Sequence, residues 1–279
     1  MRAFKVELKN RIMKKIFLTG ASSGIGLAIA HSLIARGDEV WGTSRNLIRL
    51  EHLPRLHRVR LDLADSRSID EAFKGALAEA GNFDVVINNA GDGHFGPAEH
   101  LSADEIGKQF QVLLFGHLQL IRLALAAMRS HGTGLIINVT SLASRLPVPF
   151  MAAYNAAKAA MASFTMSIQL ELPDTKVRIV DLQPADIRTA FNDAIPKSTE
   201  HDPGYKTRVA KTWDAVDRNM KNAPSPELVA AHVLRLIDSP SPPPRITVGD
   251  FFQTKIAPFI FRFLPQRVRI WGLKMYYGI

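Results

Sequence analysis

The sequence predicts an α/β protein in which a parallel sheet of about seven strands is covered by helices on both faces. Short runs rich in Val, Ile and Phe alternate with longer segments of helical periodicity, the pattern of a buried parallel sheet with crossover helices. A glycine-rich turn joins the first apolar run to the first helical segment. The alternation predicts the fold class, and the turn indicates where a ligand would bind.

The spacing of apolar residues predicts the individual strands and helices. Short apolar runs that end at polar or glycine-containing turns predict strands. These runs cover residues 15–19, 39–43, 58–61, 84–88, 135–139, 177–182 and 246–248. Apolar residues at helical spacing predict helices over 26–35, 69–80 and 103–128, and a further helix that begins near Ala153.

The chain of 279 residues contains no internal repeat and no linker rich in Gly or Ser, so we expect one domain over 14–250. Residues 1–13 precede the first strand and are predicted to be an N-terminal extension that the fold does not need. Residues 190–226 are polar and irregular, which suggests an inserted loop over the substrate. Residues 251–279 form a basic, aromatic tail that we expect to pack on the domain or on the substrate site.

The glycine-rich turn spans Thr19 to Gly26 and reads Thr-Gly-Ala-Ser-Ser-Gly-Ile-Gly. Gly20 allows a tight turn, Gly24 lets the backbone approach a pyrophosphate, and Gly26 permits close packing of helix on strand. The following helix start offers backbone N–H groups to phosphates. Together these features favour a doubly wound Rossmann fold that binds a dinucleotide, although a tight turn without ligand is the alternative. The residues of this turn that we expect to contact the cofactor are Gly20, Ser22, Ser23, Gly24, Ile25 and Gly26.

The end of the second strand distinguishes the two nicotinamide dinucleotides. NAD sites usually place an acidic residue there for the ribose 2′-hydroxyl, but this strand ends in Ser44 and Arg45, and Asp38 and Glu39 lie at its other end. Arg45 can neutralise a 2′-phosphate, with Ser44 and Ser23 as further donors. We therefore expect NADP(H), the alternative being that Arg45 is an ordinary surface arginine.

Ser141, Tyr154 and Lys158 form the candidate catalytic group. Tyr154 and Lys158 are separated by four residues, so on a helix they share one face, and Ser141 follows the expected strand 135–139. A free phenol has a pKa near ~10, and a neighbouring lysine cation would lower it toward neutrality. The three side chains suit proton transfer to or from a carbonyl or alcohol oxygen.

These motifs together resemble the single-domain short-chain dehydrogenase/reductase family. The resemblance covers roughly residues 14–190 and includes six elements in order. They are Thr19-Gly20-x-x-x-Gly24-x-Gly26, Asp62, Asn88-Asn89-Ala90-Gly91, Ser141, Tyr154-x-x-x-Lys158 and Pro184 to Thr189.

The resemblance also implies a role for each matched residue. Tyr154 would exchange a proton with the substrate oxygen, Ser141 would orient that oxygen, and Lys158 would hold the nicotinamide ribose and lower the pKa of Tyr154. The remaining matches imply cofactor contacts, although purely structural turn bonding is the alternative for Asn88 and Asn89. They are Asp62 and Leu63 at the adenine, Asn89, Ala90 and Gly91 at the adenosine ribose, and Pro184, Ile187 and Thr189 at the nicotinamide carboxamide.

Two positions depart from the family pattern. Leu113 stands where the family usually has an Asn that supports a water chain to the lysine, and leucine has no polar atom for this purpose. On a regular helix His117 would lie about 40° from Leu113 and Gln111 about 200° away, so His117 is the nearer substitute. Ala185 replaces a common Gly after Pro184, which restricts φ in the loop beside the cofactor.

Charge and cysteine content exclude several classes of function. The chain has no cysteine, so disulfides and thiolate metal sites are excluded, and we expect no metal and a cytoplasmic location. The net charge of +9 lies at the ends: six basic residues against Glu7 in 1–15, and five basic and no acidic residues in 251–279. A nucleic-acid groove is therefore not expected. The tail favours a solvated, aromatic-packed segment, with weak contact to an anionic membrane as the alternative.

The sequence thus predicts an NADP(H)-dependent oxidoreductase that interconverts a carbonyl and an alcohol. Phe150, Met151, Phe191 and the aromatic stretch 251–263 suggest an apolar substrate of steroid, retinoid or lipid type. The competing hypothesis is a catalytically impaired cofactor-binding sensor or interaction protein, because Leu113 replaces the family Asn. The family resemblance implies a homodimer or homotetramer through apolar residues of the helix 103–128 and of the helix that begins near Ala153. Those residues are Leu118, Leu120, Leu123, Met161 and Phe164.

Overall fold

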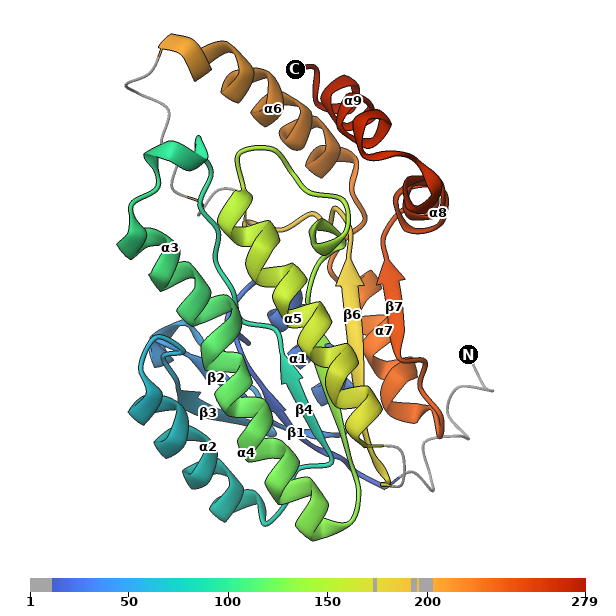
Figure 1. Cartoon of the computed structure of the whole chain (residues 1–279). Helices are drawn as coiled ribbons and strands as arrows, with labels where there is room; N and C mark the ends of the chain where they lie inside the picture. Colours follow the sequence, from blue (N-terminus) through green and yellow to red (C-terminus); the bar gives the residue numbers. More distant parts are fainter. Residues whose placement is uncertain (1–11, 173–174, 192–194, 196–202) are drawn as a thin grey trace.

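The computed structural model describes residues 12–172, 175–191, 195 and 203–279. Within them, seven parallel strands form one sheet in the order β3-β2-β1-β4-β5-β6-β7, flanked by helices on both faces (Figure 1). This confirms the predicted doubly wound architecture. The strands are β1 (Lys15–Leu18), β2 (Glu39–Ser44), β3 (Leu56–Arg60), β4 (Val85–Asn88), β5 (Gly134–Val139), β6 (Val177–Pro184) and β7 (Arg245–Val248).

The chain reverses its direction of winding between β3 and β4. Strands β2 and β3 lie on one side of β1, and β4 to β7 lie on the other side. Phe17 in β1 is in register with Trp41 in β2 and with Val86 in β4. Because all strands are parallel, their carboxyl ends lie at one edge of the sheet. Ligands of such sheets bind at that edge, at the switch in strand order.

Two apolar cores lie on the two faces of the sheet. One joins α1 (Gly24–Ala35) and α7 (Glu227–Asp238) to the strands through Ile29, Leu33 and Val233. The other face carries α2 (Ser66–Ala80), α4 (Gly116–His131) and α5 (Ala152–Glu171), with Phe73 packed edge-on against Phe17 at 5.2 Å. This layering holds the strand ends rigidly, which is what a site at that edge requires.

The long helix expected over 103–128 differs from a regular α-helix. It consists of α3 (Ala103–Phe110), a π-helical turn Gln111–Phe115 and α4. By length and composition alone, Ala103–His131 could cross a membrane. However, Leu120 and Ala124 are fully buried in the core below it, and a core helix passes the same test.

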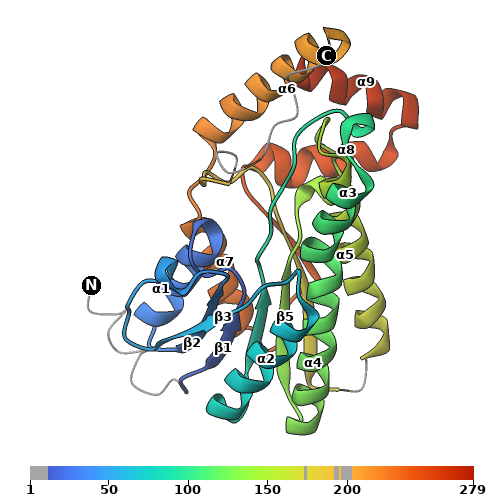
Figure 2. The ribbon, with the colours of Figure 1, turned by 90° about the vertical axis from the view of Figure 1, so that its left-hand side faces the viewer.

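The segment 190–226 also differs from the irregular loop that we expected. Residues 192–194 and 196–202 are outside the described part of the chain, but α6 (Pro203–Asn222) is a regular helix of 20 residues. The tail forms a π-helical turn Phe252–Ile256 followed by α8 (Ala257–Phe263) and α9 (Gln266–Tyr277). Figures 1 and 2 show α6, α8 and α9 together beyond the carboxyl edge of the sheet. The expected N-terminal extension lies almost entirely outside the described residues.

Candidate active site

The turn between β1 and α1 has the backbone geometry that its glycines predict. Gly20 has φ 71° and Gly24 has φ 54°, a left-handed region that favours glycine. A Cβ on Gly26 would lie 2.0 Å from the carbonyl oxygen of Gly20, so no side chain fits there. Gly26 therefore packs directly against the backbone of Gly20 and the side-chain amide of Asn89.

The start of α1 is left open toward solvent. Ser23 is its N-cap residue but makes no side-chain capping bond, and the first turn has no acidic residue. By contrast, Asp65 caps α2 through Arg67 N, and Ser102 forms a capping box at α3. The uncapped N–H groups and the helix dipole of α1 suit an anion such as a dinucleotide phosphate.

Arg45 follows β2 at the same edge and is exposed. The hydroxyl of Ser44 accepts a hydrogen bond from Asn46 N at 3.2 Å, so it is engaged in its own turn. Asp92 lies within electrostatic reach of both Arg45 and Lys158; burial raises the pKa of its carboxyl, and these two cations counteract the rise. Asp92 was not among the predicted site residues, although its position directly after Gly91 could have indicated it.

Tyr154 on α5 meets Ser141 at the end of β5. Ser141 begins a short 3-10 turn, where its Oγ accepts a hydrogen bond from Ala143 N at 3.0 Å. A hydrogen bond between Ser141 and Tyr154 favours the phenolate, but burial outweighs it and raises the pKa of Tyr154. The expected lowering of this pKa by Lys158 is not found, because the desolvation of the phenol dominates.

Lys158 is buried one helical turn further along α5. Its Nζ donates a hydrogen bond to the Val139 carbonyl at 2.9 Å and lies 5.8 Å from the centre of the Tyr154 ring. Burial lowers the pKa of Lys158 from 10.5 to about 8, while the charges of Asp181 and Asp92 act in the opposite direction. The predicted trio is thus brought together, with both titratable groups shifted toward their uncharged forms.

Asn89 fastens the glycine-rich turn to β4. Its Nδ2 donates to Thr19 O at 3.0 Å and to Gly20 O at 3.3 Å, while Asn89 N and Ala90 N both donate to Thr19 Oγ1. Structural turn bonding, the alternative weighed above, is therefore present at Asn89. Thr19, the first residue of the glycine-rich motif, is the acceptor that joins the two segments, a role that was not predicted.

The loop after β6 closes the other side of the turn. A Cβ built on Gly24 would lie 3.5 Å from Cβ of Thr189, so these two expected cofactor segments are neighbours. Ile187 is buried, and Ala185 N donates to Val248 O at 2.8 Å in the adjoining strand. On the other side of β1, Asp62 follows the outer strand β3 at the same carboxyl edge. Its carboxylate accepts a hydrogen bond from Ala64 N at 2.9 Å, and the neighbouring Leu63 is buried.

The comparisons with known proteins agree with this geometry. Residues 14–200 match the family described as short chain dehydrogenase. The chain is 29% identical over 266 residues to a 3-ketodihydrosphingosine reductase of Bacteroides thetaiotaomicron, covering 95% of this chain and 98% of that one. The chain belongs to the short-chain dehydrogenase/reductase family. It is an oxidoreductase that acts on a carbonyl or alcohol with a nicotinamide cofactor.

Solved structures show the same fold. A short-chain dehydrogenase from Streptomyces avermitilis has a TM-score of 0.79 and 27% identity, with 95% of each chain covered. An alcohol dehydrogenase from Thermococcus sibiricus, complexed with 5-hydroxy-NADP, has a TM-score of 0.71 and 27% identity over 86% of this chain and 98% of that one.

An aromatic cluster covers Tyr154 in this short-chain dehydrogenase. The ring of Phe191 lies 6.0 Å from that of Tyr154, and Phe95 packs edge-on against Trp213 of α6 at 4.8 Å. Phe150 and Tyr205 extend the same cluster at 6.3 Å. The contribution of α6 was missed, because that segment was expected to be irregular.

The family Asn is replaced by a fully buried leucine. Leu113 Cδ2 lies 2.9 Å from a Cβ built on Gly91, and Lys158 Nζ lies 3.9 Å from the same point. His117 Nδ1 is 3.4 Å from the Leu113 carbonyl, and its buried Nε2 has no hydrogen-bond partner. Burial, aided by the charge of Lys158, lowers the pKa of His117 to about 3. A role for His117 in proton transfer stays a prediction.

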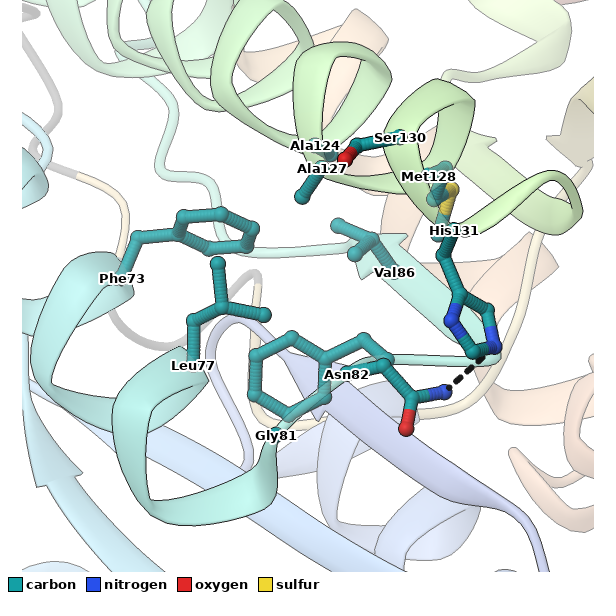
Figure 3. Close-up of a pocket in the computed structure, with 11 residues that line it drawn as sticks. Phe73, Leu77, Gly81, Asn82, Val86, Ala124, Ala127, Met128, Ser130 and His131 are labelled. Atoms are coloured by element: carbon teal, nitrogen blue, oxygen red, sulfur yellow. Dashed lines mark hydrogen bonds between the residues drawn. The ribbon is translucent and has the colours of Figure 1, made fainter.

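One pocket of the described structure lies away from this site. A cavity of about 280 Å³ lies between α2, β4 and the end of α4, where Asn82 and His131 share a hydrogen bond of 3.3 Å (Figure 3). Its walls are at the amino end of β4, opposite the edge that carries Tyr154. Among the described residues, no group of three or more His, Asp or Glu side chains could hold a metal ion.

Proposed function

We propose that this chain reduces an apolar ketone to an alcohol with NADPH, through Tyr154, Ser141 and Lys158. A bound nicotinamide supplies the hydride that reaches the carbonyl carbon. The Tyr154 hydroxyl gives its proton to the carbonyl oxygen, and Ser141 donates a hydrogen bond that positions that oxygen. Lys158 holds the cofactor ribose. The phenol of Tyr154, whose pKa burial raises, holds its proton near neutral pH, which is the protonation state that a proton donor to the carbonyl requires.

The aromatic cluster beside Tyr154 carries the substrate proposal. The ring of Phe191 lies beside that of Tyr154, and Phe150 and Trp213 pack in the same apolar cluster. Such surroundings favour an apolar molecule over a sugar or amino acid. The name of the Bacteroides relative denotes a lipid-like ketone. We extend a lipid-like, long-chain ketone to this chain as its substrate class. Polycyclic apolar ketones, such as steroids, belong to the same proposal because the sequence also predicted them.

The position of Arg45 supports NADPH over NADH. Arg45 is exposed at the end of β2, where the 2′-phosphate of NADP would lie in this fold. The guanidinium of Arg45 also attracts the carboxylate of Asp92. A phosphate adds a stronger, multiply charged acceptor for the guanidinium. Asp62, Leu63, Asn89, Ala90, Gly91, Pro184, Ile187 and Thr189 are proposed as the further cofactor contacts.

Turnover tests the proposal directly. The wild-type protein is mixed with NADPH and a panel of apolar ketones of different length, and loss of NADPH absorbance is followed. We expect activity, and we expect Tyr154→Phe to reduce it at least ~100-fold with little change in NADPH affinity, since only the proton donor is removed. Binding of NADPH without turnover of any ketone would contradict the reductase function.

A cofactor-binding sensor is the second candidate function, and Leu113 is the observation that favours it. The leucine is fully buried beside Gly91 and brings no polar atom toward Lys158. In that case the wild type would bind NADPH in a fluorescence titration but would show no turnover, and Leu113→Asn would restore activity. Turnover by the wild type would exclude it.

We also propose self-association through α4 and α5, but with a changed set of residues. Leu120 and Met161, two of the five expected contacts, are buried in the core and cannot reach a partner. Phe115, Met166 and Leu170 are exposed, and an open groove between the two helices is lined by Leu118, Leu125 and Phe164. Light scattering would test this: Leu170→Glu should lower the mass if the face is an interface.

A further inference from the structure

The two C-terminal helices expose an unusual concentration of apolar side chains. Of 19 large hydrophobic residues that are exposed among the described residues, 11 lie within 251–279, a tenth of the chain. Phe259, Phe263 and Trp271 each expose about two thirds of their surface. Apolar patches of this kind mark interaction surfaces rather than ordinary solvent-facing helices.

The exposed residues form stripes rather than a random scatter. In α8, Phe259 and Phe263 are one helical turn apart, with ring centres 5.2 Å from each other. In α9, Val268, Trp271 and Met275 follow one another at spacings of three and four residues, so they share one helix face. Each helix therefore presents a continuous apolar strip.

All charged side chains within residues 251–279 are basic. Lys255, Arg262, Arg267 and Lys274 are exposed, and 251–279 contains no acidic residue. Basic residues beside exposed Trp and Phe are the composition of helices that lie in the interface of an anionic membrane. A second copy of the same surface would bring two positively charged tails together, and the rest of the chain is nearly neutral, so self-association of the tail is disfavoured.

The tail is nevertheless part of the folded body. Tyr277 is buried, and Tyr276 OH accepts a hydrogen bond from Asn219 Nδ2 of α6 at 2.8 Å. Gln253 bonds to Asp186 in the loop after β6. The helices are thus held in place beside α6, on the side of the molecule where the strands end (Figures 1 and 2).

We propose that α8 and α9 form a docking surface for an anionic phospholipid membrane. The stripe of Phe259, Phe263, Val268, Trp271 and Met275 enters the interface, and the flanking cations contact lipid phosphates. The helix α9 packs on α6, and α6 contributes Trp213 to the aromatic cluster near Tyr154. When α8 and α9 bind the membrane, the side of the protein that carries this cluster therefore faces the lipid. The surface does not depend on the reaction proposed above, and its test uses neither cofactor nor substrate.

Vesicle binding by the full chain tests this surface. Wild-type protein is sedimented with vesicles of phosphatidylglycerol and phosphatidylcholine, and with phosphatidylcholine alone. We expect binding to the anionic vesicles, at least about tenfold weaker binding to the neutral ones, and weakening by added salt. The tryptophan emission of the protein should shift to shorter wavelength on binding, because the exposed indole of Trp271, one of three tryptophans, leaves water.

Two matched triple variants locate the contact. Phe259→Ala, Phe263→Ala and Trp271→Ala together should reduce binding about tenfold or more. The control replaces three exposed apolar residues elsewhere, Ile12→Ala, Ile48→Ala and Ile106→Ala, and should bind as the wild type does. The proposal is overturned if the wild type ignores anionic vesicles, or if the tail variant binds them unchanged. It is also overturned if light scattering shows that the tail variant only dissociates an oligomer.

Discussion

Replacing Lys158 by methionine should make the protein without cofactor more stable while it abolishes catalysis. Methionine keeps the length and most of the volume of the side chain but carries no charge. The lysine is 4% exposed, and burial lowers its pKa from 10.5 to about 8. At about 1.4 kcal/mol per pKa unit, the charged form costs the folded state about 3 kcal/mol.

Part of this gain is offset. The Val139 carbonyl, which accepts a hydrogen bond from Lys158 Nζ at 2.9 Å, loses its donor in the variant. An unpaired buried acceptor costs about 1–2 kcal/mol. At pH 7 the net stabilisation of Lys158→Met is therefore about 1–2 kcal/mol.

The pH dependence separates the charge effect from packing. The folded pKa of Lys158 is lowered, so between pH 8 and pH 10.5 the unfolded chain binds more protons than the folded one, and wild-type stability rises with pH in this window. The variant lacks this contribution. Its advantage should hence shrink by about 2 kcal/mol between pH 7 and pH 10, and it should reverse sign if the lost hydrogen bond then dominates.

Urea unfolding without cofactor, at pH 7 and at pH 10, measures the effect. Lys176→Met, at an exposed lysine, serves as the matched control and should show no comparable dependence on pH. A difference between Lys158→Met and wild type that stays constant from pH 7 to pH 10 would refute the reasoning. So would a variant that is less stable than the wild type at pH 7.

Three further substitutions test other parts of the site. Arg45→Asp should weaken NADPH binding about 10- to 100-fold and leave NADH binding equal or stronger, since a charge-assisted bond to phosphate is lost; equal affinity of the wild type for both cofactors in a fluorescence titration would count against it. Gly26→Ala should destabilise the fold by about 3 kcal/mol or more, because its Cβ would lie 2.0 Å from a backbone oxygen, whereas Gly75→Ala, with nothing within 4 Å, should be neutral or stabilising in the same urea titration. His117→Leu should raise stability by about 1 kcal/mol, because it removes a buried nitrogen without a partner, and its turnover with NADPH then measures whether His117 contributes to proton transfer.

The sheet and the trio were predictable because both depend on short-range patterns. Runs such as Leu135–Val139 are too apolar to lie anywhere but in a core, and their alternation with helices selects a parallel sheet. The four-residue spacing of Tyr154 and Lys158 is enough to place them on one helix face. The glycine positions followed equally directly, since φ 71° at Gly20 and the close contact at Gly26 favour glycine strongly.

Features set by tertiary burial were not predictable in the same way. In α6 only Val209, Thr212 and Ala215 are buried, a narrow stripe that is hidden in the sequence among many charged residues. The π-helical turn at Gln111–Phe115 has no recognisable residue signature. The apolar tail residues were expected to pack inward, yet Phe259 and Trp271 are exposed, because helix periodicity alone does not reveal which neighbours cover a face.

The reversal of the Tyr154 pKa shift follows from the same cause and affects the chemistry. Pairing a phenol with a lysine predicts a lowered phenol pKa only if the lysine keeps its full charge and the phenol keeps its contact with water. Here both side chains are desolvated, and the fully buried Leu113 adds an apolar wall where the family has an amide. Burial disfavours the phenolate, whereas Lys158, with a pKa of about 8, still carries its proton at pH 7, so the group at rest is a neutral phenol beside a lysine cation rather than an ion pair. A phenol that retains its proton is ready to give it to a carbonyl oxygen, whereas taking a proton from an alcohol requires that the phenolate be formed first. The apolar surroundings of this trio therefore support the reduction that we propose for this chain.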